Sequence, residues 1–155
     1  MRDFNHTVDV LVKAYLNDTL IQGSPCGCAI GNLIAHSLGK KVQITDAREF
    51  EGNWDGDVAT PYDWFGVLRP GRLSGITLNT IDKKNGAFQL SIIGYSVIEI
   101  GRIESAFEEH EGSFYNYNTD SSRFDGLMRV VDVLAEIHGI DLTAKEEAKL
   151  LFVKV

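Results

Sequence analysis

The chain has 155 residues, of which 44% are hydrophobic and 24% are charged, and its net charge is −7. This length predicts one domain, residues 1–155, which buries roughly 70% of its unfolded surface and needs no disulfide or metal to fold. The acidic balance argues against non-specific binding to nucleic acid or anionic membranes. It leaves basic proteins, or sites that normally hold phosphate, as candidate partners.

Neither a membrane anchor nor a secretion signal is expected. Polar and charged residues interrupt every apolar run before the about 18 residues that a membrane-spanning helix needs. The first residues lack the basic start and apolar core of a signal peptide. The chain has two cysteines, Cys26 and Cys28, which are too close in sequence to form a disulfide framework. The cytoplasm is the predicted compartment.

Two amphipathic helices are predicted in the first forty residues or so. The first has Asn5 as its expected N-cap and runs to about Leu20. The second is expected to open at Ser24-Pro25, since serine caps helices and proline is favoured at their first position. Gly39 is placed as a left-handed stop. The apolar residues of the two stripes are Val8, Leu11, Val12, Tyr15, Leu16, Cys26, Ala29, Ile30, Leu33 and Ile34.

The middle of the chain is less regular. Residues 40–72 are rich in glycine, aspartate and aromatic residues, and Val42–Ile44 can pair briefly as a strand. A connection this long inside a compact domain often carries function. For the following stretch a helix from about Asp82 to Ile93 is favoured, with a β-hairpin around Asn85-Gly86 as the alternative.

Helical signals return in the last third. Ser96 and Glu99 form a capping box, and Thr143 with Glu146 forms a second one. Between them, a stripe from Phe124 to His138 predicts a long helix that ends at Gly139. In the helix after Ser96, the buried side is expected to hold Ile100, Ile103 and Phe107, whereas Glu104, Glu108 and Glu109 are expected to face water. The predicted fold is therefore all-α, or mainly α: a compact bundle of about five or six amphipathic helices with one long irregular central segment and a possible short β-hairpin.

Cys28, Asn32 and His36 are the first set with potential chemistry. They are spaced four apart, so they lie along one face of the second helix. A thiol in the first turn of a helix feels the positive end of the dipole, which favours the thiolate. However, two turns, about 12 Å, separate Cys28 from His36, which is too far for a nucleophile and its base. Buried thiols that fill space between helices are the favoured interpretation.

No metal site and no cofactor are predicted. A structural zinc site usually has four ligands, often as two spaced pairs, and none of the four histidines stands at a zinc-finger spacing. His138 falls on an apolar stripe, where a core histidine with a satisfied nitrogen is expected.

The acidic and aromatic part of the central segment is the second set. Its candidate binding residues are Trp54, Asp55, Asp57, Tyr62 and Trp64. Exposed tryptophan beside carboxylates can bind cationic groups or anchor a protein interface. The alternative is that the aromatic side chains cover the core. An EF-hand is excluded because the glycine and the twelfth-position glutamate are missing from the pattern.

Two stretches of the chain resemble a known group of proteins. NHTVDVLVKAYLNDTL followed by CGCAIGN, and GYSVIEIGRIESAFE followed by FDGLMRVVDVLAEIHGID, are similar to uncharacterised small proteins of gut-bacterial phages, prophages and mobile elements. The likeness spans about two-thirds of the chain and favours a helical fold. It implies no activity and no catalytic residues.

The leading functional interpretation is a non-enzymatic, acidic interaction or regulatory protein of phage origin that engages a basic or host protein. The first alternative is a small cysteine-dependent enzyme that uses Cys28. The second is a helical module that binds a small molecule or a metal between its helices.

Overall fold

The computed structural model describes residues 2–23, 27–46, 51–54, 92–109 and 118–141. Its elements in chain order are α1 (Phe4–Leu16), α2 (Ala29–Ser37), β1 (Val42–Asp46), β2 (Glu51–Trp54), α6 (Val97–Glu108) and α7 (Asp120–His138). The described part is mostly helical, as predicted, with four helices and one pair of strands.

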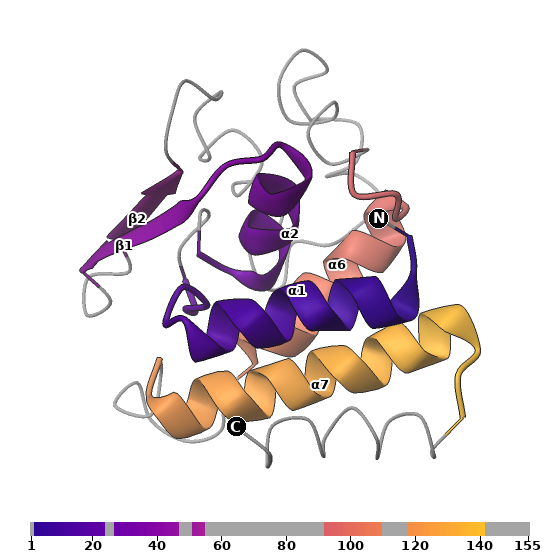
Figure 1. Ribbon diagram of the computed structural model, residues 1–155. Coiled ribbons are helices and arrows are strands. Elements are labelled where there is room, and N and C mark those ends of the chain that lie inside the picture. The colour runs from indigo at the N-terminus through magenta and orange to yellow at the C-terminus, as the bar shows by residue number, and fades with distance from the viewer. Residues whose placement is uncertain (1, 24–26, 47–50, 55–91, 110–117, 142–155) are drawn as a thin grey trace.

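The four helices pack around one apolar core. Figure 1 shows α1 and α7 lying side by side, with α6 behind α1 and α2 above it; α6 contacts both α7 and α2. Each helix contributes fully buried side chains to this core: Leu11 from α1, Leu33 from α2, Phe107 from α6 and Leu134 from α7. No helix in the described ranges is long and apolar enough to cross a membrane.

α1 follows its predicted apolar stripe, but its N-cap is Asp3, two residues before the expected Asn5. Asp3 has an extended backbone, and its carboxylate accepts a hydrogen bond of 2.9 Å from the amide of His6. Asn5 already lies inside the helix, so the prediction that it caps the helix is wrong. The cap falls where the backbone turns from extended to helical, and an aspartate stands there.

α2 begins at Ala29, with Cys28 as its N-cap, so the predicted opening at Ser24-Pro25 is wrong. The carbonyl of Gly27 accepts a hydrogen bond of 2.8 Å from the amide of Ile21. This contact with the preceding segment holds Gly27 outside the helix. The other end is as predicted: Gly39 has φ +69°, and the next amide, of Lys40, donates to the Ala35 carbonyl at 2.8 Å.

The two strands form an antiparallel pair. Val42 lies opposite Trp54, and the register shifts between Ile44 and Asp46. The strand expected at Val42–Ile44 is therefore confirmed, and a strictly all-α fold is not. The helix expected up to Ile93 does not reach that residue, because residues 92 and 93 form a turn; its remainder, and the alternative hairpin at Asn85-Gly86, lie outside the described residues.

α6 starts and α7 ends at the predicted signals, whereas α7 begins at Asp120, with Thr119 as its N-cap, before the predicted stripe from Phe124. The Ser96 hydroxyl accepts from the amide of Glu99 at 3.1 Å, and the Glu99 carboxylate accepts from the amide of Ser96 at 2.8 Å, so the capping box is confirmed. Gly139 ends α7 with φ +66°. The box expected at Thr143 and Glu146 lies outside the described residues.

Polar side chains of α7 pair with α6. Glu136 accepts a hydrogen bond of 2.6 Å from Arg102. The guanidinium of Arg129 donates to the backbone carbonyls of Ala106 and Glu109. These contacts fix the two helices against each other at both ends of their interface.

Candidate functional site

Cys28 is fully buried at the start of α2, with 0% of its surface exposed. Its sulfur accepts a hydrogen bond of 3.3 Å from the amide of Gly31. Burial, and the nearby carboxyls of Glu104 and Glu108, raise the pKa of the thiol well above its ordinary value, and the Gly31 amide offsets this only in part. The helix start therefore does not produce a reactive thiolate here, because desolvation outweighs it.

Asn32 and His36 do not complete a catalytic row with Cys28. The Asn32 amide nitrogen donates to the carbonyls of Thr19 at 2.8 Å, Gly27 at 3.0 Å and Cys28 at 3.1 Å. It thus holds the turn after α1 against the start of α2. His36 is exposed, and its ring lies 5.1 Å from that of His6, at the opposite end of α2 from Cys28. The three predicted residues have three separate roles.

Glu104 and Glu108 are buried, which corrects the expectation that they face water. Starting from Ile100, the helical positions i+3, i+4, i+7 and i+8 are Ile103, Glu104, Phe107 and Glu108. The apolar face of α6 therefore includes both acids. Helical periodicity alone predicts that both acids are buried, whereas the usual exposure of glutamate favours the opposite prediction.

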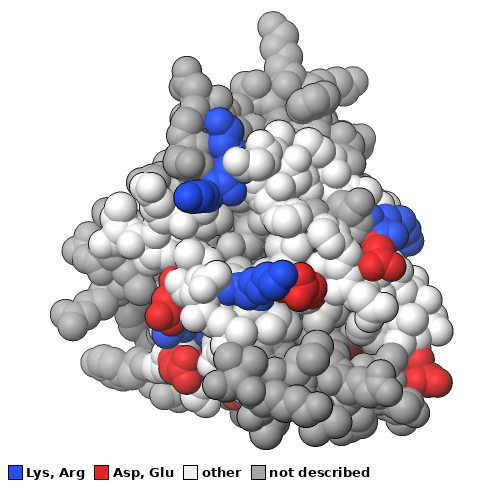
Figure 2. All heavy atoms as spheres, in the orientation of Figure 1, with Lys and Arg blue, Asp and Glu red and all other residues white. Residues whose placement is uncertain are grey.

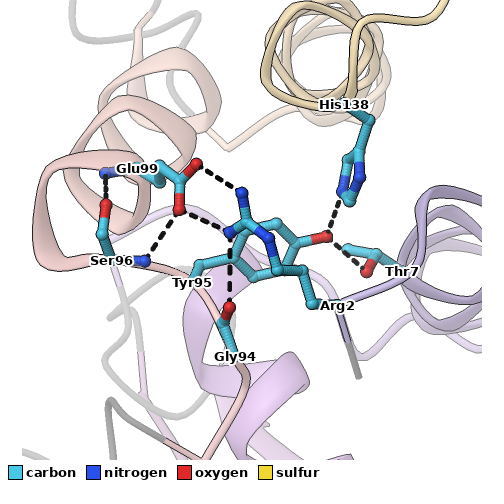
Figure 3. Close-up of polar contacts among 7 residues, drawn as sticks. All are labelled: Arg2, Thr7, Gly94, Tyr95, Ser96, Glu99 and His138. Atoms are coloured by element: carbon cyan, nitrogen blue, oxygen red, sulfur yellow. Dashed lines mark hydrogen bonds and ion pairs between the residues drawn. The ribbon is translucent and has the colours of Figure 1, made fainter.

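Tyr95, Arg2 and His138 form a second polar cluster, drawn in Figure 3. The Tyr95 hydroxyl lies 2.7 Å from Nε2 of His138 and 2.8 Å from the Thr7 hydroxyl. The guanidinium of Arg2 stands over the Tyr95 ring at 5.1 Å and binds both oxygens of Glu99, at 2.6 and 2.9 Å. The expectation of a satisfied nitrogen on His138 is confirmed.

The side chains of this second cluster link separate parts of the fold. Hydrogen bonds from Arg2 lower the pKa of Glu99 to about 2, so its carboxylate stays ionised at neutral pH. Burial raises the pKa of Tyr95, so its hydroxyl stays protonated. The cluster joins the N-terminal segment, the start of α6 and the end of α7.

A cavity of about 220 Å³ lies between α1, α2 and the start of β1. Its lining consists of Val10, Ala14, Asn17, Thr19, Asn32, Ala35, His36, Lys40 and Val42. The floor is formed by buried residues, among them Ala35 and Asn32, and the polar side chains of Asn17, His36 and Lys40 stand at the more exposed rim. None of these described lining residues is an aspartate or glutamate, although the protein carries a net charge of −7.

The charge on this side of the molecule agrees with the lining. Figure 2 shows basic side chains gathered above α1 on the side of the strands, with no described acidic side chain beside them on that face. Elsewhere on the same face, basic and acidic side chains adjoin, as Lys13 and Asp9 do at 2.8 Å. The cavity is the described site best suited to a ligand that carries negative charge.

Of the predicted binding residues in the central segment, the structure describes one. Trp54 is the last residue of β2, and Asp55, Asp57, Tyr62 and Trp64 lie outside the described residues. Across the described ranges, no group of three or more His, Cys, Asp and Glu side chains could hold a metal ion. No protein-family model, curated protein or solved structure matches the chain.

Proposed function

We propose that this protein is a non-catalytic binding protein, and that the cavity between α1, α2 and β1 takes a small polar ligand with an anionic group. The observation that carries the proposal is the cavity lining: a lysine, a histidine, amide and hydroxyl groups, and no described acid. Binding pockets commonly combine an apolar floor with a few polar groups that orient the ligand.

The size of the cavity limits the ligand. Its 220 Å³ corresponds to about seven water molecules at roughly 30 Å³ each. A molecule such as a small dicarboxylate fits this volume, whereas a nucleotide does not. The ammonium group of Lys40 would pair with the anionic group at the rim, and Ala14 and Ala35 would contact the apolar part.

The enzymatic alternative has less support. A nucleophilic cysteine needs an accessible thiolate and a base within hydrogen-bond reach. Cys28 is fully buried with a raised pKa, and His36 lies at the far end of the same helix.

The remaining expectations from the sequence stay part of this proposal. They are a cytoplasmic location, a relation to phage or mobile-element proteins, a basic or host protein as a further partner, no nucleic-acid target, and a bundle of five or six helices. The small-ligand site and a protein partner are compatible, since the cavity reaches Val42, which lies opposite Trp54 in the hairpin.

The test is an NMR titration of the ¹⁵N-labelled protein with succinate, using neutral succinamide as the matched probe. We expect succinate to shift the amides of Thr19, Asn32, His36 and Lys40, and succinamide to shift them less. Lys40→Gln should weaken succinate binding by about five- to tenfold, since a charge-assisted hydrogen bond contributes about 1.5–3 kcal/mol when buried and less at a rim.

Lys13→Gln is the control, because Lys13 is on α1 and pairs with Asp9 away from the lining. It should bind succinate as the unchanged protein does. If neither probe shifts these amides at millimolar concentration, the cavity is not a binding site of this class. If both shift them equally, the site exists and the preference for an anion is wrong.

A further inference from the structure

Two carboxyl groups are buried one helical turn apart on α6. Glu104 is 0% exposed and Glu108 is 4% exposed. Both contact the segment that runs from the end of α1 into α2: Glu108 reaches Gly23, and Glu104 reaches Ile30. They lie where α6 supports the start of α2.

The two carboxyls have different hydrogen bonding. Both oxygens of Glu108 accept from the amide of Gly23, at 3.1 and 2.9 Å, as a carboxylate does. Glu104 accepts a long hydrogen bond of 3.4 Å at Oε2 from the amide of Ile30 and also interacts with the side chains of Cys28 and Glu108, while its buried Oε1 has no hydrogen-bond partner. The backbone amide of Gly23 thus favours the ionised form of Glu108, whereas Glu104 has a buried oxygen that no donor satisfies.

Buried like charges at this separation cannot both persist. In a low-dielectric interior, desolvation and mutual repulsion each disfavour a second carboxylate. Burial, and after it the charge of Glu108, raise the pKa of Glu104 well above its ordinary value of 4.5. When the pair holds a single proton, the buried Glu104 therefore carries it, and the amide of Gly23 favours the charge on Glu108.

The described elements packed against the pair present few charged groups. The start of α2 presents the Cys28 thiol, whose own pKa is raised. Residues 20–23 contain no ionisable side chain. On α7, Arg129 donates hydrogen bonds to the backbone carbonyls of Ala106 and Glu109. Arg123, also on α7, interacts electrostatically with Tyr15 of α1.

We propose that Glu104 and Glu108 form a one-proton switch that holds α6 against residues 20–23 and 27–31, and that loss of this proton at higher pH loosens that contact. The inference is independent of the proposed ligand site. Ionised Glu104 would repel Glu108 and leave a buried charge that the Cys28 thiol and the Ile30 amide offset only in part. Separation of the two segments relieves both effects by admitting water.

The sign of the linkage follows from the direction of the pKa shift. Because the pKa of Glu104 is raised in the folded state, the stabilisation is complete below the unfolded value of about 4.5 and is lost as pH rises through the folded value. Between these two values the folded protein holds one more proton than the unfolded chain. The unfolding constant should therefore rise about tenfold for each pH unit in that window.

The experiment compares urea unfolding from about pH 5 to about pH 9 in the unchanged protein, Glu104→Gln and Glu109→Gln. Glu104→Gln keeps the shape of a protonated carboxyl but cannot ionise, so its unfolding constant should stay nearly constant over this range. Glu109 is the exposed C-cap residue that directly follows α6, so Glu109→Gln should keep the original dependence. An equal dependence in Glu104→Gln and the unchanged protein would overturn the switch.

A direct measurement covers the case in which Glu104→Gln does not fold. The ¹³C chemical shift of the Glu104 carboxyl in the unchanged protein reports its protonation. We expect the protonated shift at pH 7 and ionisation only at higher pH, together with faster amide exchange at Gly23 and Ile30. Ionisation near the ordinary value of 4.5 would overturn the proposal.

Discussion

Cys28 combines two properties that usually exclude each other. Its sulfur takes the position of an N-cap side chain at the start of α2, where serine or aspartate is more common. At the same time it belongs to the apolar core. A thiol is apolar enough for the core and still accepts a weak hydrogen bond from Gly31, so one small side chain serves both needs.

At this scale, we predict that Cys28 is an inert thiol. In a Cys26→Ala variant, its alkylation by iodoacetamide should be at least about a hundredfold slower in buffer than in urea. Exposing a core residue requires an opening that costs several kcal/mol, and each 1.4 kcal/mol slows the reaction tenfold. The rate should rise with pH beyond the ordinary thiol value of 9.0. An apparent pKa well below about 7 would instead support the cysteine-dependent enzyme.

At the scale of the elements, α6 and α7 make a close contact at Gly126. A Cβ atom at this position would lie 2.6 Å from the Phe107 carbonyl oxygen and 3.1 Å from the Phe107 ring. The first of these neighbours is helix backbone near the end of α6, and it cannot move aside alone. Glycine is therefore required here by the neighbouring helix, not by the helix in which it lies.

Gly126→Ala is thus predicted to destabilise the protein although alanine is the better helix former. Overpacking costs about 1–3 kcal/mol, and the propensity gain of about 1 kcal/mol offsets only part of it. Urea unfolding measures the difference. Ser121→Ala is the control, since Ser121 is exposed on the same helix and should change stability little. A stabilised Gly126→Ala variant would show that α6 and α7 are further apart than described.

For the whole molecule, the distribution of charge matters more than its total. Acidic side chains outnumber basic ones, 22 to 15, yet the described cavity lining has none. The β1–β2 pair borders this cavity through Val42. Trp54 ends β2 opposite Val42, so the predicted aromatic and acidic binding segment starts at the edge of the cavity.

The prediction at this scale is that Trp54 serves binding more than stability. Trp54→Ala should cost less than about 1 kcal/mol in urea unfolding, whereas a buried aromatic side chain would cost about 3–5 kcal/mol. It should also weaken capture of a partner from cell lysate, because tryptophan contributes strongly at interfaces. Val42→Thr, a change on the opposite strand, serves as the control. A large loss of stability would return Trp54 to a role in the core.

Much of the helical structure follows from the sequence alone, because its signals are local. The capping box of Ser96 and Glu99 and the left-handed ends at Gly39 and Gly139 each involve residues within about five positions of one another. Such interactions form in any chain with these residues in this order, whatever packs around them. The apolar stripes of α1 and α7 likewise depend only on helical spacing.

The tertiary structure decided where α2 begins and what the candidate site contains. The Gly27 carbonyl bonds to Ile21, which no capping rule anticipates, and this contact moves the helix start from Ser24-Pro25 to Ala29. Glu104 is buried because α2 and α7 both pack on α6, so an acidic residue on its apolar face has no route to water. Cys28 and Glu104 are far apart in the chain, and their effect on each other's ionisation depends on burial and distance, which only the packed helices determine.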